Sequence, residues 1–251
     1  AATARTGASG FAIGEKGYIS LGQDNSSNYL ADTWEYDPAT DTWTQKDDYK
    51  GGARISAIAF GIGQYGYVGT GYNGNYQKDF YRFDPQAAAG QQWEIVNGFG
   101  GQKRQGGTSF VIDDKAYICC GVNNGSYVYD FWCFDPSTGV FTQLWDIADT
   151  SDDDYDDDYI SIIRANAVSF VIDGKGYLVT GEYGSLLSNY WIYDPATDLW
   201  EGEDLTAFEG SVRKNAVAFS TGTRGCVVTG QASSSYYDDT WELSPYEYEE
   251  E

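Results

Sequence analysis

The sequence has no histidine and no methionine, and its cationic residues are scarce, with 15 Lys and Arg against 38 Asp and Glu. Without histidine, the chain has no Ser-His-Asp triad, no histidine general base and no histidine metal ligand. The net charge of −23 argues against nucleic-acid binding, because phosphate recognition requires a basic surface. No apolar run approaches the roughly 20 residues of a membrane-spanning helix, so we expect no transmembrane segment.

Cysteine is also rare in this chain. The four cysteines, Cys119, Cys120, Cys133 and Cys226, form no Cys-x-x-Cys motif and lack the spacing of a zinc site or a disulfide framework. We therefore expect buried free thiols, with a bridge from Cys133 to the adjacent pair as the alternative. The chain begins at Ala1 without an initiator methionine, which is typical of a processed mature protein or of an excerpt from a longer one. On this basis we expect an extracellular or cell-envelope location.

Five units of about fifty residues share four markers in one register. Each unit opens with an arginine, followed six residues later by a phenylalanine and 17 residues later by a glycine. The residue 13 positions after the arginine is a tyrosine in four units and Cys226 in the fifth. Five copies without a change of register do not arise by chance and predict a tandem-repeat fold. The opening arginines are Arg5, Arg54, Arg104, Arg164 and Arg213.

The fourth unit illustrates the strand pattern within a repeat. A small apolar strand is expected over 165–172 and a second strand over 176–180, joined by a turn at Asp173 and Gly174. The alternating segment 190–193 predicts a third strand, and an Asp-Pro turn leads to a fourth strand at 199–200. Four antiparallel strands per fifty residues correspond to one blade of a β-propeller.

The second half of each unit carries a resemblance to the kelch repeat. Related forms of the segment 34–38, Trp-Glu-Tyr-Asp-Pro, recur in the first four units, each followed by a further aromatic residue such as Trp43, and the fifth unit has a weaker copy at 241–245. Many kelch units have a Gly-Gly pair where this chain has a single glycine, as in Leu21-Gly22. The resemblance implies an all-β fold, a kelch-type β-propeller like the central domain of galactose oxidase. The copper of that enzyme class needs histidine ligands, which this chain does not contain.

We expect a single propeller domain over 1–251 with five blades of four antiparallel strands. The predicted repeats are 5–53, 54–103, 104–163, 164–212 and 213–245, and residues 246–251 form an acidic tail. The fifth unit stops after its third strand, at Leu243-Ser244-Pro245. Kelch propellers commonly close the ring with a strand from the other terminus, and only residues 1–4 precede the first unit. The repeats therefore also allow a sixth blade upstream of Ala1.

Two sets of residues are candidates for ligand binding. In a propeller, the loops between second and third strands lie on one face, and here these loops are rich in Asn, Ser, Gly and Tyr. Such loops combine adaptable hydrogen bonds with flat aromatic surfaces that suit sugars, although turn formation alone also favours Asn, Ser and Gly. The opening arginines begin the first strands and are predicted to ring the channel mouth, as an anion site or as ties between blades. The candidate ligand-binding residues are Arg5, Arg54, Arg104, Arg164, Arg213, Tyr72, Tyr127, Tyr183, Tyr236 and Tyr237.

An acidic insertion over 149–158 precedes Arg164 and lengthens the spacing between successive Asp-Pro turns to 59 residues, against 47 to 51 elsewhere. Clustered carboxylates are hard oxygen ligands, and Asp152, Asp153, Asp154 and Asp156 form a candidate Ca²⁺ site. The segment lacks the ligand order and the glycine of an EF-hand, so a solvated acidic loop is the alternative. We expect no other cofactor.

The pattern favours a non-catalytic binding module of the cell surface or envelope that contacts a glycan or a protein partner through the loop face. One alternative is a sugar mutarotase or epimerase, since sialic-acid mutarotases resemble this fold. Such an enzyme requires an asymmetric pocket with a carboxylate near the axis. A structural subunit of a surface assembly is the other alternative, because propellers serve many functions.

Overall fold

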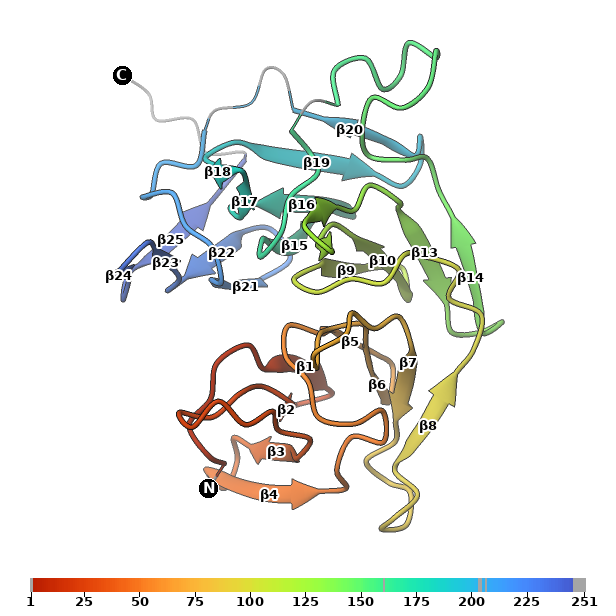
Figure 1. Cartoon of the computed structure of the whole chain (residues 1–251), viewed down its shortest axis with the longest axis vertical. Coiled ribbons are helices and arrows are strands. Elements are labelled where there is room, and N and C mark those ends of the chain that lie inside the picture. Colours follow the sequence, from red (N-terminus) through yellow and green to blue (C-terminus); the bar gives the residue numbers. More distant parts are fainter. Residues whose placement is uncertain (1, 160, 203–204, 206, 246–251) are drawn as a thin grey trace.

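Five β-sheets in the described part of the chain are arranged as blades around a common axis (Figure 1). The computed structural model describes residues 2–159, 161–202, 205 and 207–245, and within these ranges it contains strands and no helix. The prediction of an all-β propeller with five blades is therefore confirmed. The acidic tail predicted over 246–251 lies outside the described residues.

Four blades have four antiparallel strands, and the fifth has three strands within the described residues. The first two blades contain β1 (Ser9–Ile13), β2 (Lys16–Ser20), β3 (Thr33–Asp37), β4 (Thr42–Lys46), β5 (Ile58–Ile62), β6 (Tyr65–Gly69), β7 (Phe80–Phe83) and β8 (Trp93–Val96). The third and fourth contain β9 (Thr108–Ile112), β10 (Lys115–Cys119), β13 (Trp132–Asp135), β14 (Val140–Gln143), β15 (Val168–Ile172), β16 (Lys175–Val179), β19 (Tyr190–Asp194) and β20 (Leu199–Glu201). The fifth contains β21 (Val217–Ser220), β22 (Gly225–Val228) and β25 (Thr240–Leu243).

Short two-residue hairpins extend three of the loops between second and third strands. These loops lie at the end of the blades where the first strands begin, because backbone pairs join the two segments in every blade. The sequence pattern predicts loops at these places and does not distinguish the hairpins. The hairpins are β11 (Val122–Asn123) with β12 (Ser126–Tyr127), β17 (Glu182–Tyr183) with β18 (Ser185–Leu186), and β23 (Gln231–Ala232) with β24 (Ser235–Tyr236).

The core lies between successive blades. In the first blade Phe11 and Tyr18 pair across β1 and β2, and their rings stack with centroids 5.2 Å apart. Both rings then contact Phe83 of the second blade, which is fully buried. Aromatic side chains are rigid and large, so a few of them fill the wide space between two diverging sheets. The repeated aromatic markers of the sequence are therefore the inter-blade core.

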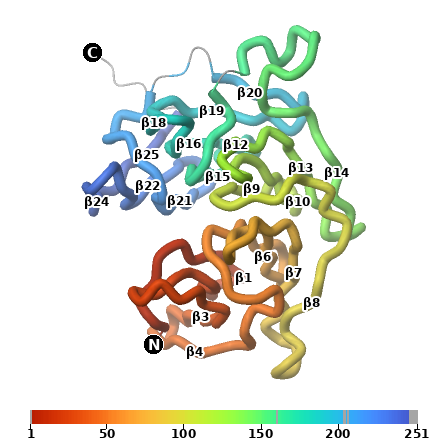
Figure 2. The backbone as a smooth tube through the Cα atoms, in the orientation of Figure 1, coloured from red at the N-terminus to blue at the C-terminus, as the bar shows by residue number. Residues whose placement is uncertain are grey.

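The ring is open between the fifth blade and the first. The first strands of successive blades pack side by side from β1 to β5, β9, β15 and β21, whereas β21 and β1 do not pack in this way within the described part of the chain. Both end blades flank the same side of the ring, at the left of the view (Figure 2). The kelch resemblance implies that the two termini close the ring. The described residues do not form this closure.

Two further expectations concern the cysteines and the membrane. All four cysteines are free, three of them buried and Cys133 partly buried, so the prediction of free thiols is confirmed. Among the described residues no helix has the length and apolarity to cross a bilayer.

Candidate ligand site at the channel mouth

The channel mouth is formed where the first strands begin. In each blade, one residue before the first strand pairs through its backbone with the loop that follows the second strand, as Ala165 pairs with Glu182. The next residue has a left-handed backbone in every blade, with φ between 53° and 65°, and these residues are Gly7, Ser56, Gly106, Asn166 and Asn215. Glycine and asparagine tolerate this conformation better than most residues.

A series of backbone hydrogen bonds connects these five residues around the axis. The N–H of Ser56 donates to the carbonyl of Gly7 at 2.8 Å, and the same bond recurs between each pair of neighbouring blades up to Asn215. The mouth therefore has a rigid rim of backbone held by left-handed residues. It encloses a cavity of ≈ 450 Å³ lined by Thr6, Ser56, Asn166 and Asn215, among others. A second cavity of ≈ 190 Å³ lies deeper along the channel, between the small residues of the first strands.

The five arginines do not point into this mouth as a ring of charges. Four of them, Arg54, Arg104, Arg164 and Arg213, have at most 1% of their surface exposed, and only Arg5 lines the cavity within the described residues. Each guanidinium donates to the carbonyl 16 residues later, at the end of the second strand. Of the two predicted roles, the geometry agrees with a structural tie: the guanidiniums lie beneath the surface and join segments of the same blade, rather than neighbouring blades or an anion at the mouth.

Four of the arginines are paired with an aspartate that precedes the third strand. The pairs are Arg5–Asp32, Arg54–Asp79, Arg104–Asp130 and Arg213–Asp239. The fourth blade is different, because Arg164 contacts the Oδ1 atom of Asn189 at 3.1 Å together with several carbonyls. Burial lowers the pKa of Arg164 to about 10, so this side chain still carries its charge at neutral pH.

These ion pairs predict a specific dependence of stability on pH. Hydrogen bonds from Arg5 and Arg213 hold the pKa values of Asp32 and Asp239 below the ordinary aspartate value of about 3.9. A carboxylate with a depressed folded-state pKa stabilises the fold above pH 4, and this contribution is lost as the pH falls through the folded-state pKa. We therefore expect the difference in Tm between the native chain and Asp32→Asn/Asp239→Asn to be constant from pH 7 to 5 and to shrink towards pH 2.

The difference between the two proteins is the relevant measure, because acidification also reduces the repulsion within a chain of net charge −23. Thermal unfolding followed by circular dichroism at several pH values provides it. A difference that stays the same down to pH 2 would contradict the assignment of these ion pairs.

One charged cluster breaks the five-fold pattern of the mouth. Glu182, at the loop position of the fourth blade, accepts a hydrogen bond from Asn166 Nδ2 at 2.9 Å and pairs with Lys214 of the fifth blade at 2.7 Å. The Glu182 position is held in the other blades by Gln23, Tyr72, Val122 and Gln231. This cluster of Glu182, Lys214 and Asn166, the rim cluster, brings together a carboxylate, an ammonium and an amide, and Asn166 is its member that lines the cavity. The cluster is not among the residues predicted from the sequence, although its two charges stand at repeat positions that are uncharged in the other units.

The candidate tyrosines lie in the loops as predicted, and two of them pair across blades. Tyr127 and Tyr183 form an edge-to-face pair with centroids 4.7 Å apart, and the Tyr127 hydroxyl accepts a hydrogen bond from the N–H of Gly184. Tyr236 is 80% exposed, whereas Tyr237 stacks on the buried Arg213 at 4.4 Å. The paired and the exposed rings therefore offer aromatic surface on the face that holds the rim cluster.

Tyr72 has a different partner, since its ring packs against Tyr76 of the same loop with centroids 5.0 Å apart. Its backbone pairs with Ile55, at the beginning of the second blade. Tyr72 thus occupies the position that Glu182 holds in the fourth blade.

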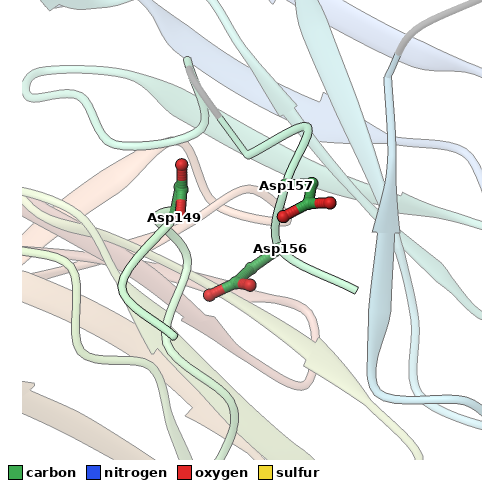
Figure 3. A group of neighbouring side chains, drawn as sticks. All are labelled: Asp149, Asp156 and Asp157. Atoms are coloured by element: carbon green, nitrogen blue, oxygen red, sulfur yellow. The ribbon is translucent and has the colours of Figure 1, made fainter. Parts of the chain in front are cut away.

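The acidic insertion brings together a set of carboxylates that differs from the predicted one. Carboxylate oxygens of Asp149, Asp156 and Asp157 lie within 4.8 Å of one another, and they converge on one space in the loop (Figure 3). Asp156 is buried and accepts hydrogen bonds from the backbone of Thr150 and Ser151, so it organises the loop. Of the predicted Ca²⁺ ligands, only Asp156 belongs to this group, and Asp152, Asp153 and Asp154 do not. Calcium binding stays a prediction.

Comparisons with known proteins agree with this geometry. The family described as the Kelch motif matches residues 103–144, which contain the whole third blade. A search of curated proteins returned no match. Among solved structures, the chain is similar to the one titled "Structure of YjhT", with a TM-score of 0.70 and 19% identity over 91% of this chain and 75% of that chain. The chain is thus a five-bladed β-propeller whose third blade matches the kelch motif.

Proposed function

We propose that the protein is a non-catalytic binding module that holds a glycan at the channel mouth. The rim cluster of Glu182, Lys214 and Asn166 carries this proposal, because it makes one side of an otherwise repetitive mouth chemically distinct. Sugar hydroxyls need both donors and acceptors, and the cluster supplies an ammonium, a carboxylate and an amide. Ligand sites commonly combine a few such polar groups with an apolar surface in a concave place.

The aromatic loops support the same proposal. The Tyr127–Tyr183 pair belongs to hairpins β11–β12 and β17–β18, and Glu182 lies directly before Tyr183. A tyrosine ring offers a flat apolar face for the C–H groups of a sugar and loses little conformational entropy on binding. The rigid backbone rim reduces the entropic cost of ordering the site.

The test is a glycan-array screen of the purified chain, with and without calcium, followed by titration of the best ligand. We expect Glu182→Gln and Tyr183→Ala each to weaken binding at least tenfold. The matched control is Trp145→Ala, an aromatic residue that is 52% exposed and packs on Tyr155 of the acidic insertion, away from the mouth. The glycan affinity of the Trp145→Ala variant should equal that of the native chain.

Other outcomes of this screen point elsewhere. Binding that requires calcium brings the acidic insertion into the proposal, whereas equal loss in the Trp145 variant contradicts a site at the mouth. A blank array under both conditions contradicts glycan binding and favours a protein partner, which a pull-down with the same variants then examines.

A sugar-converting enzyme is the second candidate, and Glu182 is the observation that favours it. This carboxylate is hydrogen-bonded to Asn166, which lines the cavity, and a mutarotase or epimerase needs an acid–base group near the axis. Its two oxygens are held by Asn166 and Lys214, which suits binding better than proton transfer. Anomer exchange of free sugars followed by NMR distinguishes the two, since a binding module leaves the exchange rate unchanged. The extracellular or cell-envelope location stays a prediction.

A further inference from the structure

At each of the four interfaces between neighbouring blades, the preceding blade contributes the same pair of stacked side chains. On one blade, a phenylalanine of the first strand stacks on the residue opposite it in the second strand, which is a tyrosine in the first four blades. The centroid distances are 5.2, 5.2, 5.4 and 5.6 Å. We call this stacked pair the knob; the four knobs are Phe11–Tyr18, Phe60–Tyr67, Phe110–Tyr117 and Phe170–Tyr177.

The second, third and fourth blades receive the knob with a small residue and two aromatics. The fifth blade receives it with Gly225 and has no such aromatic pair within the described residues. A Cβ atom added to Gly66 would lie 2.1 Å from the ring of Phe11, so only a hydrogen fits at this place. Glycines at the same position receive Phe110 and Phe170 in the fourth and fifth blades. Beside the glycine of the second blade, Phe83 packs on Trp93 with centroids 4.8 Å apart. We call the small residue with this aromatic pair the socket.

The fifth blade presents a knob position that no other part of the described chain covers. Phe219 is 51% exposed, whereas the phenylalanines of the other four knobs are at most 9% exposed. Val217, at the beginning of the same strand, is 60% exposed, against 7% for Val168 in the fourth blade. The outer face of this blade is therefore an uncovered apolar surface.

The first blade presents a socket that none of the described residues enters. An added Cβ at Gly17 would meet no atom closer than Tyr36 Cβ of its own blade, at 4.0 Å. Tyr36 already packs on Trp43 with centroids 5.1 Å apart, as the corresponding aromatics do in the second, third and fourth blades. Trp43 is 44% exposed, whereas Trp93, at the same position of the second blade, is 4% exposed. The socket is thus formed without an occupant.

The backbone series around the axis is interrupted at the same place. It runs from Gly7 to Asn215, and its two ends make no corresponding bond to each other. A second series has the same limits: Gly22, Gly71, Gly121 and Gly181 each donate from N–H to the carbonyl of the arginine that opens the next blade. Both series stop between the fifth blade and the first, as do the aromatic contacts.

We propose that the space between the fifth and first blades is a docking site for one further kelch-type blade, a partner segment of about fifty residues. Such a segment presents a socket to Phe219 and a knob to Gly17 and Tyr36. Three interfaces of this molecule already show that a knob and such a socket are complementary, and continuation of the ring would place the added blade against both faces. In the solved structure titled "Structure of YjhT", a quarter of the chain lies outside the match with this protein.

A second copy of this chain is a poorer occupant. Its first blade has the socket for Phe219, but the second blade follows it around the ring and would overlap the first blade of the other copy. Two chains of net charge −23 also repel each other. A single blade satisfies both faces without this overlap.

The test compares the chain with a six-repeat version. In that version a second copy of residues 54–103 directly precedes Arg5 in place of residues 1–4, which reproduces the junction between Lys103 and Arg104. We expect a monomer that unfolds in one transition, with Tm raised by roughly 5–10 °C. Quenching of Trp43 fluorescence by acrylamide is obtained by subtracting the signal of a Trp43→Phe variant. It should be several-fold weaker in the six-repeat chain than in the five-repeat chain, whereas quenching of Trp145 should be the same in both.

The matched variant Phe219→Ser identifies the contact. It should change Tm by less than about 2 °C in the five-repeat chain and lower it by several degrees in the six-repeat chain. Separate unfolding of the added repeat, or no effect of Phe219→Ser in either chain, overturns the proposal. A large decrease in Tm caused by Phe219→Ser in the five-repeat chain would show that the fifth blade already packs against the first. Reversible dimers of the five-repeat chain in light scattering would show that a second copy occupies the space. Either outcome also overturns the proposal.

Discussion

Replacing Arg104 with methionine is expected to lower the free energy of unfolding by about 3–5 kcal/mol, because a buried carboxylate then loses its ion partner. The Arg104 side chain is 0% exposed and that of Asp130 is 8% exposed, so water does not replace the lost contact. The variant also removes the hydrogen bond from the guanidinium to the carbonyl of Cys120. Chemical denaturation followed by tryptophan fluorescence measures the loss.

Arg82 provides the matched control, since it forms an ion pair with Glu94 in which the side chains are 37% and 66% exposed. Exposed pairs contribute little, and Arg82→Met should change the free energy of unfolding by less than about 1 kcal/mol. In the double variant Arg104→Met/Asp130→Leu, part of the loss should be recovered, because no unpaired charge remains buried. Equal losses in the Arg104 and Arg82 variants would show that the buried arginines do not hold the blades together.

The sequence indicates these arginines as repeat markers, but it does not identify their partners. The aspartates follow 25 to 27 residues later and are brought back by the second strand and its loop. This spacing recurs in four units and is the signal that could have revealed the pairs. Asn189 at the same place in the fourth unit hides the pattern, because it replaces the charged partner with an amide.

The strands themselves are predicted well, because alternation and turn residues act locally. The fourth unit predicts strands over 165–172 and 176–180, and the structure has Val168–Ile172 and Lys175–Val179. The first strand begins three residues later than predicted, since Asn166 has φ 56° and belongs to the rim of the mouth. A left-handed residue ends the extended conformation, and the apolar pattern around it gives no sign of this.

The rim cluster depends on ring geometry rather than on local pattern. Glu182 and Lys214 belong to different blades and meet only because each blade is rotated about the axis relative to the last. A charge at a repeat position that is otherwise uncharged is visible in the sequence, but its neighbour across the blades is not. The open side of the ring is hidden for the same reason, since Phe219 looks identical to the buried phenylalanines in the repeat alignment.

The second large effect on stability is expected from substitution of the glycines in the sockets. In most sockets the second strand of the receiving blade carries a glycine, and Ala116 holds the position in the third blade. Gly66 is needed because no larger side chain fits against Phe11. Backbone freedom is not the reason, since neither Gly66 nor Gly17 has a left-handed φ. The two glycines therefore differ only in what lies beside them: the ring of Phe11 against Gly66, and open space beside Gly17.

Gly66→Ala is expected to destabilise the protein by about 1–3 kcal/mol, because the new methyl group would lie 2.1 Å from the Phe11 ring and force two blades apart. Gly17→Ala adds the same group where the nearest atom is 4.0 Å away. It should leave stability unchanged or raise it by up to about 1 kcal/mol, since alanine loses less backbone entropy than glycine in a strand. Denaturation of the two variants beside the native chain measures both effects. If Gly17→Ala costs as much as Gly66→Ala, the socket of the first blade is occupied in solution and the ring is closed.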